Sequence, residues 1–173
     1  MKKKSLTLLT TILLSQNSFA IETETIGDAF LVLIPSLSYG TTLYLKDKEG
    51  EHQFYKSFAT NAGVTYGLKY GVNRTRPNGK RYSFPSGHTS TTFQSASFIH
   101  KRYGLKYAIP AYLGATFVGY SRVDAKAHYT SDVVAGAIIG SLSGFYFTTK
   151  QKKLNIQPIA MKSGYGIGID YKW

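Results

Sequence analysis

Along most of the chain, apolar residues recur at helical spacing or form long uncharged runs, and both patterns predict helices. Residues 26–45 carry a single charge, Asp28, and predict a long apolar helix with a bend at Pro35. Glycine recurs every fourth residue from 136 to 144, a stripe that lets another helix approach closely. The remaining helices are predicted where apolar residues recur at helical spacing or form uncharged runs, over 54–70, 88–104, 106–123 and 130–149.

The segments between and after these helices have other patterns. Residues 73–87 predict a loop, because Pro77, Asn78-Gly79 and Pro85 favour turns. Apolar residues occupy every second position from 165 to 173, which is typical of a strand, and this strand can pair with 154–161 in a hairpin that turns near 162–164. The predicted fold is an all-α helical bundle over 26–150 followed by a short β-hairpin-like tail over 154–173.

The first twenty residues have the order of a secretory signal peptide. Three lysines precede an apolar run from Leu6 to Leu14, and a small residue, Ala20, ends the segment. An uncleaved membrane anchor is the alternative interpretation, but the apolar run is shorter than the ~20 residues that span a bilayer, which favours a signal peptide. We therefore expect residues 1–20 to be removed and the protein to be exported to the periplasm, where it associates with a membrane.

Charge and cysteine content narrow the classes of function. The chain has 173 residues, which suits a single domain, and a formal net charge of +12. Loss of residues 1–20 removes three lysines and leaves a net charge of about +9. Such a protein attracts phosphate esters, nucleic acids or anionic lipids. The chain has no cysteine, which excludes disulfides, cysteine nucleophiles and cysteine metal sites.

Polar residues gather where the predicted apolar helices end, and they suit phosphoryl transfer. A phosphoryl group in transfer spreads charge over its oxygens, so it needs fixed cations and backbone N–H donors. Lys69, Arg76 and Arg122 can supply the cations. In the Pro-Ser-Gly-His segment that opens a helix, Ser86 and Gly87 place backbone donors and the helix N-terminus at the anion.

Two histidines can divide the chemical work. Asp132 follows His128 by four residues, so it can reach one ring nitrogen and leave the other free as a nucleophile. His88, at a helix start, can donate a proton to the leaving oxygen. This chemistry needs no metal ion.

Each of these features also has a simpler interpretation. A histidine and an aspartate one helical turn apart are often a surface or capping pair, and basic residues near helix ends often only complement the helix dipole. A metal site at His128 and Asp132 is a further alternative, but no other histidine or carboxylate cluster lies near them in the sequence. His52 and His100 have no evident role.

Three segments taken together resemble the signature of the type 2 phosphatidic acid phosphatase superfamily. They are KYGVNRTRP (69–77), PSGH (85–88) and SRVDAKAHYTSD (121–132). The signature has a lysine, six residues and Arg-Pro, then Pro-Ser-Gly-His, then Ser-Arg, five residues, His, three residues and Asp, and the chain matches it in order. The resemblance implies an all-helical core, a covalent phosphohistidine at His128, proton donation by His88 and no metal. It also implies that phosphate is held by Lys69, Arg76, Ser86, the Gly87 amide and Arg122.

The expected function is a metal-independent phosphatase acting on phosphomonoesters or diphosphates. The short loop between the first two segments resembles the lipid-phosphatase branch of the superfamily, which favours phosphatidic acid, phosphatidylglycerol phosphate, an isoprenyl diphosphate or phosphorylated lipid A as substrate. A soluble periplasmic non-specific acid phosphatase is the main alternative. A vanadium haloperoxidase, which binds vanadate in a similar cage, and a basic anion-binding module are the others. No cofactor and no nucleic-acid partner are expected.

Overall fold

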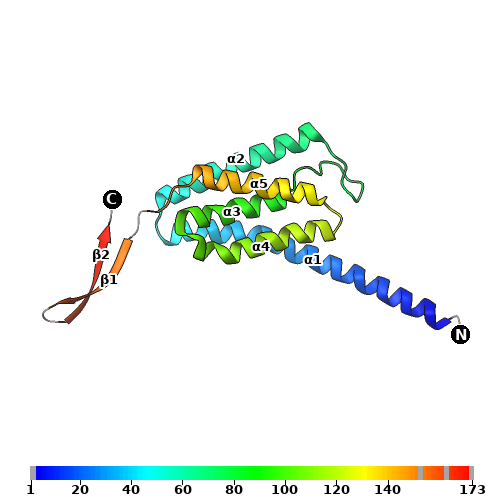
Figure 1. The fold of residues 1–173 in the computed structure, drawn as a ribbon, viewed down its shortest axis with the longest axis horizontal. Coiled ribbons are helices and arrows are strands. Elements are labelled where there is room, and N and C mark those ends of the chain that lie inside the picture. The colour runs from blue at the N-terminus through cyan, green and yellow to red at the C-terminus, as the bar shows by residue number, and fades with distance from the viewer. Residues whose placement is uncertain (1–2, 152–153, 162–163, 172–173) are drawn as a thin grey trace.

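The fold is a helical bundle with a separate hairpin at its C-terminal end (Figure 1). The computed structural model describes residues 3–151, 154–161 and 164–171. Its elements are α1 (Lys3–Tyr44), α2 (Lys48–Val72), α3 (Gly87–Tyr103), α4 (Leu105–Asp124), α5 (Thr130–Phe147), β1 (Leu154–Met161) and β2 (Gly164–Tyr171). The prediction of an all-helical core is confirmed.

Helix α1 is longer than the predicted helix over 26–45. It begins at Lys3, passes through Pro35 and ends at Tyr44, and its N-terminal part projects beyond the other helices (Figure 1). Residues 3–20 of the expected signal peptide belong to the same helix, and cleavage after Ala20 stays a prediction. Residues 22–44 are long and apolar enough to cross a membrane.

Helix α2 also begins earlier than predicted, at Lys48 instead of residue 54. The reason is Asp47, whose side chain accepts a hydrogen bond from Gly50 N at 3.0 Å and so caps the first turn. The same carboxylate binds Arg102 of α3, which also donates to the carbonyl oxygen of Thr149 at 3.1 Å. These bonds fix the end of the bundle that lies away from the loops over 73–86 and 125–129.

Helix α3 occupies the centre of the bundle and contacts all four other helices. Its closest neighbour is α5, where the predicted glycine stripe faces the backbone of α3. A Cβ atom at Gly140 would lie 2.1 Å from the carbonyl oxygen of Ser90, and one at Gly144 would lie 2.7 Å from that of Gln94. Glycine is therefore required for this approach, which holds the N-terminal ends of α3 and α5 together.

The interior around α3 is polar, whereas many large apolar side chains lie on the surface. Buried hydroxyl and amide groups bond across the helices, as when Gln94 Nε2 donates to Ser57 Oγ at 2.7 Å and Thr65 Oγ1 pairs with Ser90 Oγ at 3.0 Å. The exposed apolar side chains come from α1, α2, α4 and α5 and include Val32, Leu37, Leu113, Ile138 and Leu142, each more than half exposed. Small and polar residues inside with apolar residues outside is the arrangement that helices adopt in a lipid environment.

The C-terminal tail forms the predicted hairpin. Strands β1 and β2 pair antiparallel, with Leu154 opposite Tyr171 and Met161 opposite Gly164. The predicted turn at 162–163 lies outside the described residues. Figure 1 shows the hairpin at the end of the bundle away from the N-terminus of the chain.

Candidate active site

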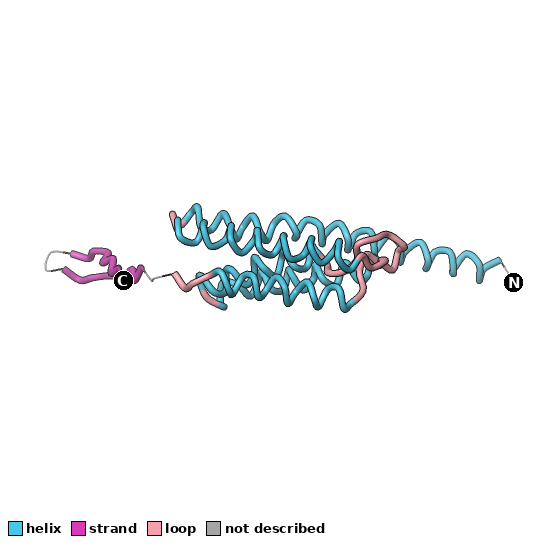
Figure 2. Tube along the Cα trace, turned by 90° about the horizontal axis from the view of Figure 1, so that it is seen from above, coloured by secondary structure: helices cyan, strands magenta, loops and turns pink. Residues whose placement is uncertain are grey.

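The predicted site residues come together at one end of the bundle. The loop from α2 to α3 and the loop from α4 to α5 lie side by side there (Figure 2). Two backbone hydrogen bonds join them to each other and to α5: Ser86 N donates to Asp132 O at 2.9 Å, and Asn78 N donates to Lys126 O at 3.1 Å. Segments far apart in the sequence thus form one continuous surface.

Lys69 lies in the last turn of α2 and is mostly buried. Its Nζ donates to the carbonyl oxygens of Tyr82 at 3.0 Å and Pro85 at 2.8 Å, which fixes the loop before α3. An ammonium group has three donors, so one remains for a ligand. Burial and the nearby charge of Arg76 lower the pKa of Lys69 to about 8, so it is still mainly protonated at neutral pH.

Arg76 lies in the loop after α2 and links the two halves of the site. Its positive charge lowers the pKa of Lys69, His88 and His128, so it lies within electrostatic reach of all three. Its Nε is buried and has no hydrogen-bond partner among the described residues. A buried guanidinium donor without an acceptor is a position for an anionic ligand.

Ser86 and Gly87 begin α3 as predicted. Ser86 is the N-cap residue, and its Oγ accepts hydrogen bonds from Thr89 N at 3.4 Å and from Thr89 Oγ1 at 3.0 Å. The first N–H groups of a helix have no carbonyl partner within it, so this terminus can bind an anion. A Cβ at Gly87 would lie 3.5 Å from Lys69 Cε, which places the glycine directly beside that cation.

His128 and Asp132 lie close together, but they are not the hydrogen-bonded pair within one helix that the spacing predicts. His128 lies in the loop before α5, and Asp132 is in the first turn of that helix. Nδ1 of His128 is 3.7 Å from Asp132 Oδ2, too far for a hydrogen bond, and it is buried without a partner in the described part of the chain. Burial and the charges of Lys69 and Arg76 lower the pKa of His128 to about 4, while Asp132 acts in the opposite direction. The imidazole is therefore neutral at pH 7.

Two residues that sequence analysis did not select bind Asp132 instead. Ser83 Oγ donates to Oδ2 at 2.5 Å, and Arg74 Nη1 donates to Oδ1 at 2.9 Å. The amide of Tyr129 donates to Oδ2 at 3.0 Å, and the Arg74 guanidinium lies 4.1 Å from the Tyr129 ring centroid. Arg74 could have been found from its position two residues before Arg76, because alternate residues of an extended segment point the same way.

Arg122, at the end of α4, is nearly fully buried and is bound by α1. Its Nη1 donates to Asp28 Oδ1 at 2.8 Å, and its Nη2 donates to the carbonyl oxygen of Glu24 at 2.7 Å. Asp28 Oδ1 also lies 3.0 Å from Nε2 of His88. Asp28 is therefore a third residue of this end that sequence analysis did not select.

Within the described residues, no group of three or more histidine, aspartate or glutamate side chains is arranged to hold a metal ion. The arrangement instead offers a neutral buried imidazole, a second imidazole beside a carboxylate, and several cations around one helix N-terminus. These groups can bind a tetrahedral anion and exchange a proton with it.

Comparisons with known proteins identify the family of the chain. The model of the PAP2 superfamily matches residues 78–156. The chain is 30% identical to lipid A 4'-phosphatase of Helicobacter pylori over 176 residues, which covers 91% of this chain and 88% of that protein. It is 40% identical to lipid A 1-phosphatase of Porphyromonas gingivalis over 90 residues, covering 50% of this chain and 20% of the relative.

A solved structure shows the same fold. The crystal structure of Aquifex aeolicus LpxE matches with a TM-score of 0.57 and 25% sequence identity, over 69% of this chain and 84% of the other. The long alignment with the Helicobacter pylori protein, the family match and this fold agree with the three-part signature. The chain belongs to the PAP2 superfamily.

Proposed function

We propose that this phosphatase removes a phosphate group from a membrane lipid, specifically the 4'-phosphate of lipid A, through a phosphohistidine at His128 and without a metal ion. One observation carries the proposal: two imidazoles and four cations lie at one end of a bundle whose outer surface is apolar. The imidazoles are those of His88 and His128, and the cations are Lys69, Arg74, Arg76 and Arg122. The choice of lipid A follows the alignment with the Helicobacter pylori 4'-phosphatase, which extends over nearly the whole of both chains.

The cations supply a cage for the phosphate oxygens. Lys69 has one free donor, Arg76 has a buried donor without a partner, and two of the five N–H groups of Arg122 are not used in its bonds to α1 and Ser121. The N-terminal amides of α3, beginning with Gly87, add donors that carry no mobile proton. Such fixed donors stabilise the charge on a phosphoryl group in transfer.

The two histidines carry the bond changes. In the first step the Nε2 lone pair of His128 forms a bond to phosphorus, the bond from phosphorus to the lipid oxygen breaks, and that oxygen takes a proton from His88. In the second step water attacks phosphorus and gives its proton to His88, and the bonding electrons return to His128. Phosphate and the lipid alcohol are the products, and both histidines regain their starting states. The lowered pKa of His128 supports its role as a nucleophile at neutral pH.

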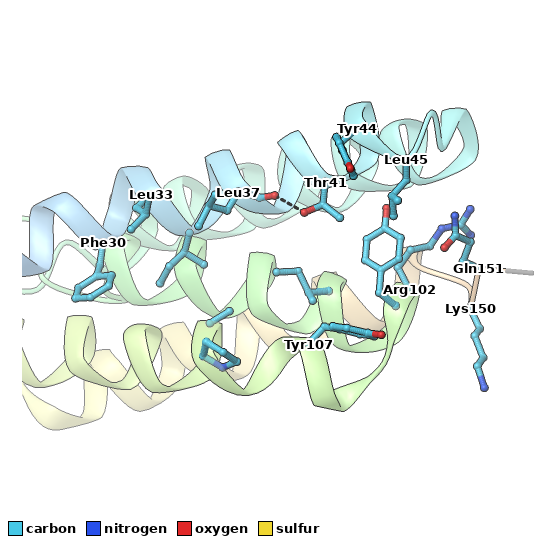
Figure 3. Close-up of a pocket in the computed structure, with 15 residues that line it drawn as sticks. Phe30, Leu33, Leu37, Thr41, Tyr44, Leu45, Arg102, Tyr107, Lys150 and Gln151 are labelled. Atoms are coloured by element: carbon cyan, nitrogen blue, oxygen red, sulfur yellow. Dashed lines mark hydrogen bonds between the residues drawn. The ribbon is translucent and has the colours of Figure 1, made fainter. Parts of the chain in front are cut away.

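An apolar groove along α1 is available to the lipid part of the substrate, and it runs from near the site toward the opposite end of the bundle. A cavity of about 1030 Å³ lies between α1 and α4 and is lined mainly by apolar side chains. Figure 3 shows Phe30, Leu33 and Leu37 along one wall, with Tyr107 on the other side. The groove begins at Phe30, two residues after Asp28, and reaches Arg102 and Gln151 at the opposite end of the bundle, so an acyl chain in it would lie along α1 away from the bound phosphate.

The apolar exterior supports a membrane setting for this reaction. Residues 22–44 of α1 can cross a bilayer by length and composition, and the site lies near the first turns of that stretch. The phosphate would then be held at the membrane surface while the acyl chains stay among the helices and lipids. With residues 1–20 acting as an export signal, this surface would face the periplasm.

A substrate panel on detergent-purified protein tests the proposal. Hydrolysis of bisphosphorylated lipid A should exceed that of small organic phosphates by at least about tenfold in kcat/KM, because only the lipid gains binding energy from the apolar surface. Mass spectrometry of the product should show loss of the 4'-phosphate. Vanadate should inhibit the reaction, and EDTA should leave it unchanged.

Three results of this panel would contradict the proposal. Equal activity on soluble phosphate esters would favour the non-specific acid phosphatase. Loss of the 1-phosphate instead would reassign the position that is cleaved. Loss of activity in EDTA would refute the metal-independent mechanism.

A further inference from the structure

Asp28 contacts the site from a helix that lies outside the three signature segments. Its Oδ1 is 3.0 Å from His88 Nε2, and it accepts a hydrogen bond from Arg122 Nη1 at 2.8 Å. One carboxylate oxygen thus joins α1 to the start of α3 and to the end of α4. The side chain is about half exposed, so the contact is at the edge of the site that a substrate would enter.

Packing of α1 against α4 fixes the position of this carboxylate. A Cβ at Gly27 would lie 2.1 Å from Ser121 Oγ and 2.7 Å from Arg122 Nη2, so the helices meet closely one residue before Asp28. The bond from Arg122 Nη2 to the carbonyl oxygen of Glu24 holds the preceding turn in the same way. This packing holds the α1 backbone close to Arg122, and from that position the Asp28 side chain reaches both Arg122 and His88.

We infer that Asp28 is a positioning residue for the phosphatase reaction: its carboxylate binds Nε2 of His88 and turns Nδ1 toward the leaving oxygen. The inference rests on the proposed phosphohistidine mechanism, in which His88 is the proton donor. With Nε2 held by Asp28, Nδ1 is the ring nitrogen that has no hydrogen bond to any described residue. In the first step the proton moves from His88 Nδ1 to the lipid oxygen, and in the second step a proton returns to Nδ1 from water.

The charges around His88 explain why a carboxylate is needed there. Burial lowers the pKa of His88, and the guanidinium groups of Arg122 and Arg76 lower it further. Asp28 is the group among its described neighbours that raises this pKa, both through its charge and through its hydrogen bond. An imidazole in this cationic site would otherwise lose its proton before it could serve as an acid.

An inhibitory role for the contact between Asp28 and Arg122 predicts the opposite kinetic effect of removing the carboxylate. Because Asp28 binds Arg122, it could act as an anion that occupies the phosphate site and must be displaced. In that case removal of its charge would lower KM and raise activity. Loss of a positioning group lowers kcat and leaves KM nearly unchanged, so the two roles are separable by kinetics.

The test compares Asp28→Asn with the unaltered enzyme on two leaving groups. For lipid A, kcat should fall by about 10- to 100-fold with KM changed by less than about threefold. For p-nitrophenyl phosphate, whose leaving group departs without a proton, the rate of enzyme phosphorylation, measured as the burst of p-nitrophenolate, should fall far less, although the later hydrolysis step still needs His88 as a base. The activity of Asp28→Asn on lipid A should also decline at a lower pH than that of the unaltered enzyme, because His88 then loses its proton earlier as the pH rises.

Two further variants complete the test. Asp28→Glu keeps the charge and should restore part of the high-pH activity, whereas Glu22→Gln, which removes an exposed charge from the same helix, should behave as the unaltered enzyme. A loss of the p-nitrophenolate burst rate as large as the loss of kcat on lipid A, an unchanged pH profile, unchanged activity or increased activity in Asp28→Asn would each overturn the inference. If the unaltered enzyme releases no phosphate from either substrate, the proposed function fails and the role of Asp28 fails with it.

Discussion

His128→Ala is expected to lower hydrolysis of the lipid substrate by about 10⁴-fold or more, because the variant has no group that can form the covalent intermediate. The side chain is almost fully buried, so the substitution removes packing contacts and a hydrogen bond with the Ser83 backbone, but the hydrogen bonds of Lys69 and Asp132 that hold the loops remain. The variant should therefore stay folded and should still bind vanadate or phosphate through the cations. Steady-state kinetics and thermal unfolding in detergent measure the two properties separately.

His52→Ala is the matched control for this variant. His52 is exposed on α2 near the end of the bundle that lies away from the site, so its removal should not change activity. If His128→Ala keeps a tenth or more of the activity in a preparation where the control is normal, another residue is the nucleophile or the activity belongs to a contaminant.

Asp132→Asn is expected to lower kcat by about 10²- to 10³-fold and to destabilise the protein as well. The carboxylate is fully buried and accepts hydrogen bonds from Ser83 Oγ, Arg74 Nη1 and Tyr129 N. An asparagine presents an amide N–H₂ group on one side, so one of these donors faces another donor. A buried donor left without an acceptor costs about 1–3 kcal/mol, and more for a charged group. The same change removes the negative charge 3.7 Å from His128 Nδ1 that stabilises its cationic intermediate.

Asp124→Asn serves as the control, because Asp124 is exposed at the end of α4 close to the same loops. Activity and thermal unfolding of both variants should be measured together. Normal kcat in Asp132→Asn would show that the carboxylate has only a structural role at the start of α5, where it caps the helix.

The fold could be predicted from the sequence because most of its determinants are local. Uncharged runs and helical spacing located the helices, and the glycine stripe over 136–144 correctly indicated a close helix contact. The start of α2 was missed because it depends on one capping side chain, Asp47, and not on apolar periodicity. The length of α1 was underestimated because residues 1–20 were assigned to a signal peptide, and because Glu22 and Glu24 precede the run over 26–45 that carries a single charge.

The site was predicted less completely, for a physical reason. Signature residues such as Lys69 and His128 are identified by spacing along the chain, and the structure brings them to one surface. Asp28 and Arg74 act only through contacts in space, and a single acidic residue in an apolar helix gives no sign of its partner. Arg122 illustrates the same limit, because its bonds to α1 depend on how two distant helices pack.

The most direct test of the central claim is to identify the phosphorylated residue during turnover. In His88→Ala, p-nitrophenyl phosphate should still phosphorylate the enzyme because its leaving group needs no proton, but hydrolysis should be slow because water has no base. After an alkaline quench, which preserves phosphohistidine, peptide mass spectrometry should locate up to about one phosphate per chain on His128. Phosphate on a different residue, or sustained turnover with no phosphorylated His128 peptide, would contradict the account.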